Sequence, residues 1–145
     1  MEKRGMLYFA DLDMRTVLQL KNISGLEDSC IFHCEQMVEK LLKHLLIMRT
    51  GKNDYRHRPT ELVRQLDLEI ELKDYLSLIQ ELQDSYFDRR YETSNYVVYS
   101  KEEYEEIIES SLSLYKLLLS IINKNNMSYR SSNNKFISKS SVFNK

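Results

Sequence analysis

The spacing of apolar residues divides the chain into helices joined by short polar segments. Apolar positions recur every three or four residues, the period of an amphipathic helix, in residues 8–22, 27–49, 59–66, 69–86 and 101–122. The clearest of these segments is 27–49, with one apolar stripe made by Cys30, Cys34, Met37, Leu41, Leu45 and Met48. The other side of that helix is predicted to be a polar face, made by Glu35, Gln36, Glu39, Lys40 and Lys43.

Residues that start and stop helices stand at the edges of these segments. Ser24 with Glu27, and Ser100 with Glu103, have the spacing of a capping box. Gly51 suits a helix C-cap, and Pro59 suits the first turn of a helix, where its missing N–H costs nothing. Four long helices and one short helix with short connections predict an all-α, mostly antiparallel bundle of four to five helices.

The composition changes after residue 122. Residues 123–145 contain six Asn, six Ser and no apolar stripe, so we expect a polar C-terminal tail behind a bundle of residues 1–122. The formal net charge of −1 hides this division. Residues 1–122 carry 16 basic and 22 acidic residues, a balance of −6, whereas the tail carries five basic and no acidic residues. The body is therefore a poor non-specific binder of nucleic acid on charge alone.

The composition also excludes several classes of protein. Three Gly and one Pro argue against an all-β chain and against a glycine-rich phosphate loop. No apolar run approaches the ~18–20 residues that a membrane span needs, and the N-terminus lacks the apolar core of a secretory signal. We therefore expect a cytoplasmic protein without membrane contact, with Cys30 and Cys34 as reduced thiols.

The cysteines offer one candidate metal site, which the helical spacing argues against. Cys30 and Cys34 share the apolar stripe, whereas His33 points about 100° away from it. A closed zinc site needs four convergent ligands, and only His44 and His57 remain. We therefore interpret the thiols as buried core residues, and we predict neither a metal nor a cofactor.

Three groups of polar residues could bind an anion or a nucleotide, and each has a structural alternative. His33 and His44 share a helix face with Lys40. That face is either a polar surface that binds an anion or holds a proton-shuttling pair, or a helix–helix seam with two partly exposed histidines. His57 lies between Arg56 and Arg58, as a phosphate contact or as part of a solvated charge cluster beside Asp54. The third group combines guanidinium groups with aromatic rings and comprises Arg89, Arg90, Tyr91 and Tyr96. These residues either bind a nucleotide or close the end of the bundle.

The second helix resembles the signature helix of HEPN domains. In that family an aromatic residue is followed by Gln, then Glu-Lys, then Lys, and the matching residues here are Phe32, Gln36, Glu39, Lys40 and Lys43. A His before a short leucine-bearing helix, with slightly wider spacing than usual, matches His57, Leu62 and Leu66. An Arg-Tyr pair before the last helix matches Arg90 and Tyr91. The resemblance covers about residues 8–122.

The resemblance implies a helical bundle, commonly a homodimer, that often works with a minimal nucleotidyltransferase in prokaryotic toxin–antitoxin or other conflict systems. Many relatives are metal-independent ribonucleases, whose motif is an Arg followed after four to six residues by a His near the last helix. Here no His follows Arg89, Arg90 or Arg130. The resemblance therefore implies a non-catalytic interaction or nucleotide-binding module without assigned catalytic residues.

The candidate residues for contact with a nucleotide, RNA or phosphate are His33, Gln36, Lys40, Lys43, His57, Arg90 and Tyr91. Two alternatives stay open. One is a ribonuclease with a rearranged site that combines His33, His44 or His57 with Arg89 or Arg90. The other is a structural bundle whose basic tail binds RNA or an acidic partner electrostatically.

Overall fold

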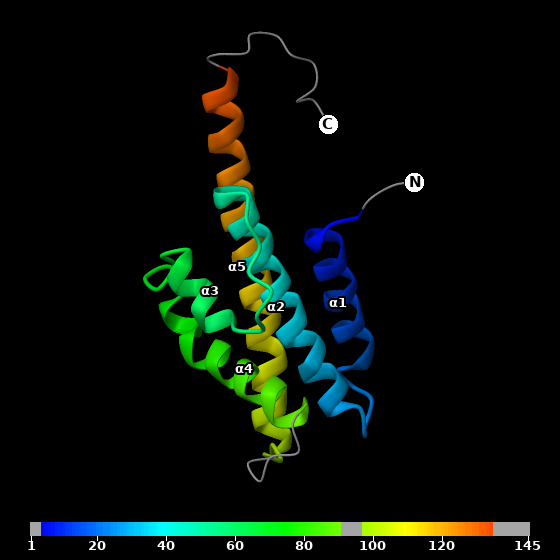
Figure 1. The fold of residues 1–145 in the computed structure, drawn as a ribbon. Helices are drawn as coiled ribbons and strands as arrows, with labels where there is room; N and C mark the ends of the chain where they lie inside the picture. Colours follow the sequence, from blue (N-terminus) through cyan, green and yellow to red (C-terminus); the bar gives the residue numbers. More distant parts are fainter. Residues whose placement is uncertain (1–3, 91–96, 135–145) are drawn as a thin grey trace.

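The computed structural model describes residues 4–90 and 97–134, with the backbone alone for Arg90 and residues 127–134. It confirms an all-α bundle (Figure 1). The α-helices are α1 (Met6–Leu20), α2 (Glu27–Thr50), α3 (Pro59–Gln65), α4 (Leu76–Arg90) and α5 (Lys101–Asn134), and a 3₁₀ turn, η1 (Lys73–Tyr75), precedes α4. None of the helices in the described residues is long and apolar enough to cross a membrane.

Helix α2 is the centre of the bundle. It packs against α1, α5, α4 and α3, and α1 and α4 lie on different sides of it (Figure 1). Helices α1 and α4 run opposite to α2, as short connections predict. Helix α5 runs in the same direction as α2, because the long α3–α4 excursion returns the chain to the end where α2 starts.

The core follows the predicted stripes of α2 and α5. Cys30, Cys34, Met37 and Leu41 are fully buried, and the two cysteines are free thiols, as predicted. On α1, Ala10 and Val17 are buried, whereas the apolar residues Leu7 and Leu18 of the same helix are exposed. Since α1 packs almost entirely on α2, only a narrow strip of its surface is covered.

Two predicted helix boundaries differ most from the structure. The fourth helix starts at Leu76 rather than near residue 69, because the chain leaves α3 through Asp67, which has a positive φ of 55°. Hydrogen bonds from the backbone of Asp67 to Arg64 and from that of Leu68 to Val63 close the end of α3 as a Schellman motif. Helix α5 continues past residue 122 to Asn134, into the segment predicted as a tail, because Asn and Ser do not by themselves end a helix.

One capping box forms and the other does not. The amide of Glu103 donates to Ser100 Oγ (3.1 Å) and the amide of Ser100 donates to Glu103 Oε1 (3.0 Å), which is the reciprocal pair predicted at the start of α5. At α2 the N-cap residue is Leu26, without a side-chain cap, and Glu27 instead accepts from the amide of Gly25. A helix capped by Ser24 would start at Gly25, whereas α2 starts two residues later, at Glu27.

Candidate functional site

The predicted polar face of α2 is largely buried, which is the main departure from the sequence analysis. Glu35 is 1% exposed, Glu39 2% and Lys43 5%, because α3 and α4 pack over that side of the helix. Gln36 and Lys40 lie between this covered side and α1 and are partly exposed. The charged groups of the face therefore meet partners within the protein instead of water.

The first polar cluster joins α1 to α2. Asp13 on α1 is buried and accepts hydrogen bonds from two candidate residues of α2. His33 Nδ1 lies 2.8 Å from Asp13 Oδ1, and Lys40 Nζ lies 2.5 Å from Asp13 Oδ2. One carboxylate therefore engages both candidates. His44, expected on the same face, is partly buried, and burial lowers the pKa of its imidazole.

The second polar cluster lies on the other side of α2. Lys43 Nζ is 3.3 Å from Glu39 Oε2, and His57 Nδ1 is 3.1 and 3.2 Å from the two oxygens of the Glu39 carboxylate. Because Glu39 accepts from Nδ1–H, it selects the tautomer of the neutral imidazole that leaves Nε2 as an acceptor. The His57 side chain is 44% exposed, so Glu39 holds a histidine whose ring still reaches solvent.

Glu35 completes this second cluster from one helical turn away. Gln36 Nε2 donates to Glu35 Oε1 (3.1 Å), whereas Glu35 Oε2 has no hydrogen-bond partner among the described residues. Burial, followed by the charge of Glu39, raises the pKa of Glu35 to about 9. Glu35 is therefore a neutral carboxylic acid at pH 7, and Glu39 carries the negative charge that faces Lys43 and His57.

Aromatic rings flank the second cluster. The imidazole of His57 lies 4.8 Å from the Tyr86 ring of α4, and Tyr86 stacks at 6.2 Å on Phe32 of α2. The guanidinium of Arg58 lies 5.6 Å from the centre of the Phe87 ring. His57, from the loop before α3, is thus held between a buried carboxylate and an aromatic surface of α2 and α4.

The structure divides the seven predicted residues between different places. His33 and Lys40 meet at Asp13, whereas Gln36, Lys43 and His57 meet around Glu35 and Glu39. The backbone of Arg90 ends α4, and Tyr91 lies outside the described residues. The neighbouring Arg89 pairs with Asp28 at 2.7 Å and donates to Ser85 Oγ.

The carboxylates that organise both clusters were not among the predicted site residues. Asp13 carried a usable signal, since it stands between Ala10 and Val17 at helical spacing, where an apolar residue is expected. Glu35 gave no such signal, and Glu39 stood out only as part of the resemblance of the second helix to the HEPN signature. Their burial depends on where α3 and α4 pack, and the period of α2 does not contain that information.

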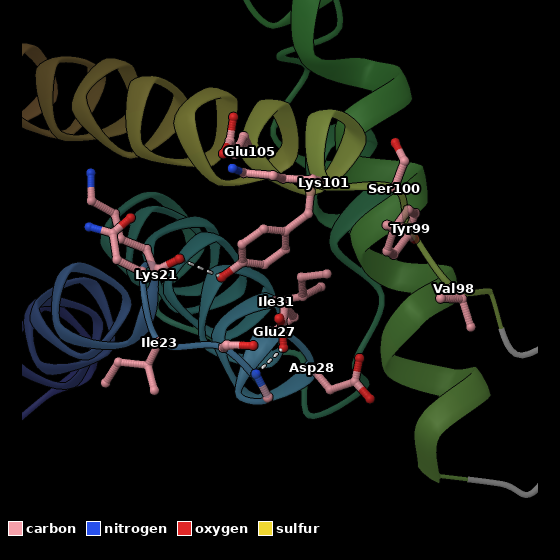
Figure 2. A pocket seen from close by; sticks show the side chains of 14 residues that line it. Lys21, Ile23, Glu27, Asp28, Ile31, Val98, Tyr99, Ser100, Lys101 and Glu105 are labelled. Carbon is pink, nitrogen blue, oxygen red and sulfur yellow. Dashed lines mark hydrogen bonds between the residues drawn. The ribbon is translucent and has the colours of Figure 1, made fainter.

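A hollow of about 810 Å³ opens at the end of the bundle where α2 and α5 begin (Figure 2). Its described lining includes none of the seven candidates and carries charges of both signs, among them Lys21, Lys101, Glu27 and Glu105. Tyr104 also lines the hollow and its hydroxyl donates to the carbonyl of Lys21 (3.1 Å), while Glu27 accepts from the Gly25 amide. Because positive and negative side chains line the hollow together, the lining favours neither an anionic nor a cationic ligand.

The described residues hold no group of three or more His, Cys, Asp or Glu side chains that could ligate a metal ion. The second cluster can present the imidazole of His57 to a ligand in a fixed orientation. A buried carboxylate fixes one nitrogen and an aromatic ring supports one side, so that the second nitrogen can accept a proton or a hydrogen bond.

Comparison with protein families supplies an independent finding. A search against family models matches the HEPN domain over residues 7–122, which is most of the chain and includes both polar clusters. Searches of curated proteins and of solved structures found no match.

Proposed function

This chain belongs to the HEPN domain family, and from that premise we propose that it is a non-catalytic module that contacts a nucleotide or RNA and binds a protein partner. Membership supports a nucleotide- or RNA-related role in general. The proposal goes further, to a cytoplasmic homodimer that pairs with a nucleotidyltransferase in a prokaryotic toxin–antitoxin or related system.

The observation that carries the nucleotide part is the Glu39–His57 pair. Its 3.1 Å contact holds the imidazole beside Tyr86 while the ring stays 44% exposed. A ring that is oriented before the ligand arrives loses little conformational freedom on binding. His57 is therefore placed to contact a phosphate oxygen when protonated, or a base edge when neutral.

The cations of α2 contribute less than their number suggests. Lys40 is bound to Asp13, and Lys43 is buried against Glu39. A phosphate would have to displace a carboxylate from either ammonium group. We therefore infer that His57 makes the main contact with the nucleotide or RNA and that Gln36, Arg90 and Tyr91 are secondary candidates for this contact.

The non-catalytic part rests on the positions of the histidines. The chain has three, at positions 33, 44 and 57, so that no His follows an Arg in the segment before the last helix. The ribonuclease motif that the family resemblance implies is therefore missing from its expected place.

Support for a partner comes from α1. Its large apolar side chains Leu7, Phe9, Leu12 and Leu18 are between 37% and 46% exposed, because α1 is covered mainly by α2. Leu7 and Leu18 lie on one side of α1 and Phe9 and Leu12 on the other, and exposed apolar surface marks a protein–protein contact where it is continuous. We expect a homodimer, which light scattering after size-exclusion chromatography tests directly. A monomer at every concentration up to 100 μM would refute the dimer.

Calorimetry tests the nucleotide part. We expect ATP, or another nucleotide at millimolar concentration, to bind the protein with measurable heat, and the His57→Ala variant to lose at least half of the binding affinity. The His44→Ala variant is the matched control, because His44 lies outside both clusters. Absence of heat and of any thermal shift with all common nucleotides would remove this part of the proposal.

A ribonuclease with a rearranged site is the second candidate. The observation in its favour is that Glu39 orients His57 as a carboxylate orients a general base, and that Tyr86 beside it precedes Arg89 and Arg90 by about one helical turn. An RNA-cleavage assay decides between the candidates. Activity that is lost in the His57→Ala variant supports this one, and equal activity in the His33→Ala, His44→Ala and His57→Ala variants excludes it.

A further inference from the structure

The loop before α3 exposes an aromatic side chain almost completely. Tyr55 is 83% exposed, although a tyrosine ring normally stabilises a protein by burying its apolar faces. Both faces of such a ring are open to another planar group. A single exposed apolar residue is unremarkable in itself, so the meaning of Tyr55 depends on what surrounds it.

The segments on both sides of Tyr55 are fixed. Asp54 Oδ1 accepts from the backbone amide of Arg56 (2.9 Å), and Asp54 Oδ2 accepts from Arg56 Nη2 and Gln65 Nε2 (both 2.8 Å). These hydrogen bonds from Arg56 hold the pKa of the Asp54 carboxyl below its usual range. His57 on the other side is bound to Glu39. Tyr55 therefore projects from an ordered turn.

The loop is also a positive region on an acidic body. Residues 49–58 contain Arg49, Lys52, Arg56, Arg58 and one acidic residue, Asp54, a local balance of +3. The whole of residues 1–122 has a balance of −6. Lys52, Arg56 and Arg58 are all exposed, so positive charge surrounds the open ring.

We propose that residues 51–58 bind single-stranded RNA, with an unpaired base stacked on Tyr55 and the adjoining phosphates contacted by Lys52, Arg56 and Arg58. Stacking on an exposed aromatic ring flanked by cations is how proteins hold unpaired bases with little sequence preference. A duplex keeps its bases stacked on each other, and the acidic body repels its phosphates. This inference rests on the RNA contact in the proposed function and gives it a location.

The loop also connects this surface to the second cluster. His57 follows Arg56 directly, and Arg58 lies against Phe87 of α4. Because Arg56, His57 and Arg58 directly follow Tyr55 along the chain, they are the candidate contacts for the phosphates next to a base stacked on Tyr55.

Fluorescence anisotropy with a labelled twelve-nucleotide oligo(U) and the full chain tests the inference. We expect the Tyr55→Ala variant to bind about 5- to 150-fold more weakly, the range measured for removing one stacked base contact. The Tyr55→Phe variant should bind within twofold of the unchanged protein. Ile70→Ala is the matched control, because Ile70 is 82% exposed between Glu69 and Glu71, and it should leave the affinity unchanged. A matched RNA duplex should bind at least tenfold more weakly.

The outcomes separate this inference from the proposed function. If oligo(U) binds equally to the Tyr55→Ala and Ile70→Ala variants, the loop is not the site, while RNA binding by the protein stands. If the duplex binds as well as the single strand, the stacking contact is refuted. If nucleotides bind by calorimetry but RNA does not, the inference fails and the proposed function survives. If Tyr55→Ala keeps RNA affinity but breaks the dimer, Tyr55 is a protein contact, which also overturns the inference.

Discussion

Lys43 and Glu39, one helical turn apart on α2, form an ion pair at 3.3 Å with side chains only 6% and 3% exposed. Such a pair gives little net stability, because desolvation offsets most of the attraction between the charges. Removing Lys43 is different, since Glu39 then stays buried without its ammonium partner, although it keeps the hydrogen bond to His57.

We therefore expect the Lys43→Met variant to lose about 3–5 kcal/mol of unfolding free energy. The double variant Lys43→Met with Glu39→Leu should recover most of this loss, because neither buried charge remains. Urea unfolding followed by circular dichroism measures both. A double variant as unstable as the single one would show that the loss comes from packing.

The second prediction concerns the pH dependence that Glu35 creates. Its pKa of about 9 in the folded protein lies far above the ordinary value for an unfolded glutamate, so the folded state holds a proton that the unfolded state releases. The stability that this proton gives is complete below about pH 4.5 and is lost as the pH rises through 9. Stability should therefore fall between pH 6 and pH 9.

The Glu35→Gln variant cannot release that proton. Its unfolding free energy should fall less over the same pH range. At pH 9 it should be about 1–3 kcal/mol higher than that of the unchanged protein, which is the cost of burying a polar group without a full set of hydrogen bonds. Urea unfolding at pH 6 and pH 9 gives the two slopes. Glu106→Gln, at an exposed position of α5, is the control. Parallel slopes for Glu35→Gln and the unchanged protein would contradict the assignment.

The third prediction concerns Asp13, which accepts from both His33 and Lys40. The Asp13→Ala variant leaves two partly buried donors without their acceptor and should cost about 1–3 kcal/mol of unfolding free energy. Asp11→Ala is the control on the same helix. Asp11 pairs only with Arg15 at the surface, where such pairs contribute at most about 1 kcal/mol. Equal losses for the two variants would mean that the Asp13 cluster does not join α1 to α2.

The fourth prediction compares the two serines that sequence spacing placed at helix starts. Ser100 makes the reciprocal cap with Glu103, so the Ser100→Ala variant should lose about 1 kcal/mol. Ser24→Ala should change the unfolding free energy by less than about 0.5 kcal/mol, the usual limit for surface substitutions, because α2 starts without a side-chain cap. Thermal unfolding of both variants and of the unchanged protein measures the two losses. A larger loss at Ser24 would mean that it caps α2 in solution.

How far the sequence predicts this fold depends on the kind of information each element needs. Helix α2 starts at Glu27 as predicted and ends one residue later, at Thr50, because a long apolar stripe and Gly51 specify it locally. The predicted start of α4 was wrong. Leu68 and Leu72 are buried in a turn before the helix, and their spacing of four residues is also that of an apolar helical stripe. Periodicity reports burial, and here a non-helical segment is buried as well.

The candidate residues show the same limit. Family resemblance identified Gln36, Lys43 and His57, which the structure does bring together. It also grouped them with Lys40, which lies in the separate cluster at Asp13 together with His33, a candidate from the helix-face argument. A motif along one helix cannot distinguish residues that face α1 from residues that face α3, because the neighbouring helices decide this.

The length of α5 separates charge along the molecule. Residues 101–109 at its start carry five acidic residues and one basic residue, whereas residues 123–134 at its end carry Lys124 and Arg130 and no acidic residue. At about 1.5 Å per residue, the centres of these segments are roughly 35 Å apart. The helix is thus an electric dipole with its positive end away from the body. Near a polyanion, the chain should orient with that end leading, which brings a target to the protein in one preferred direction.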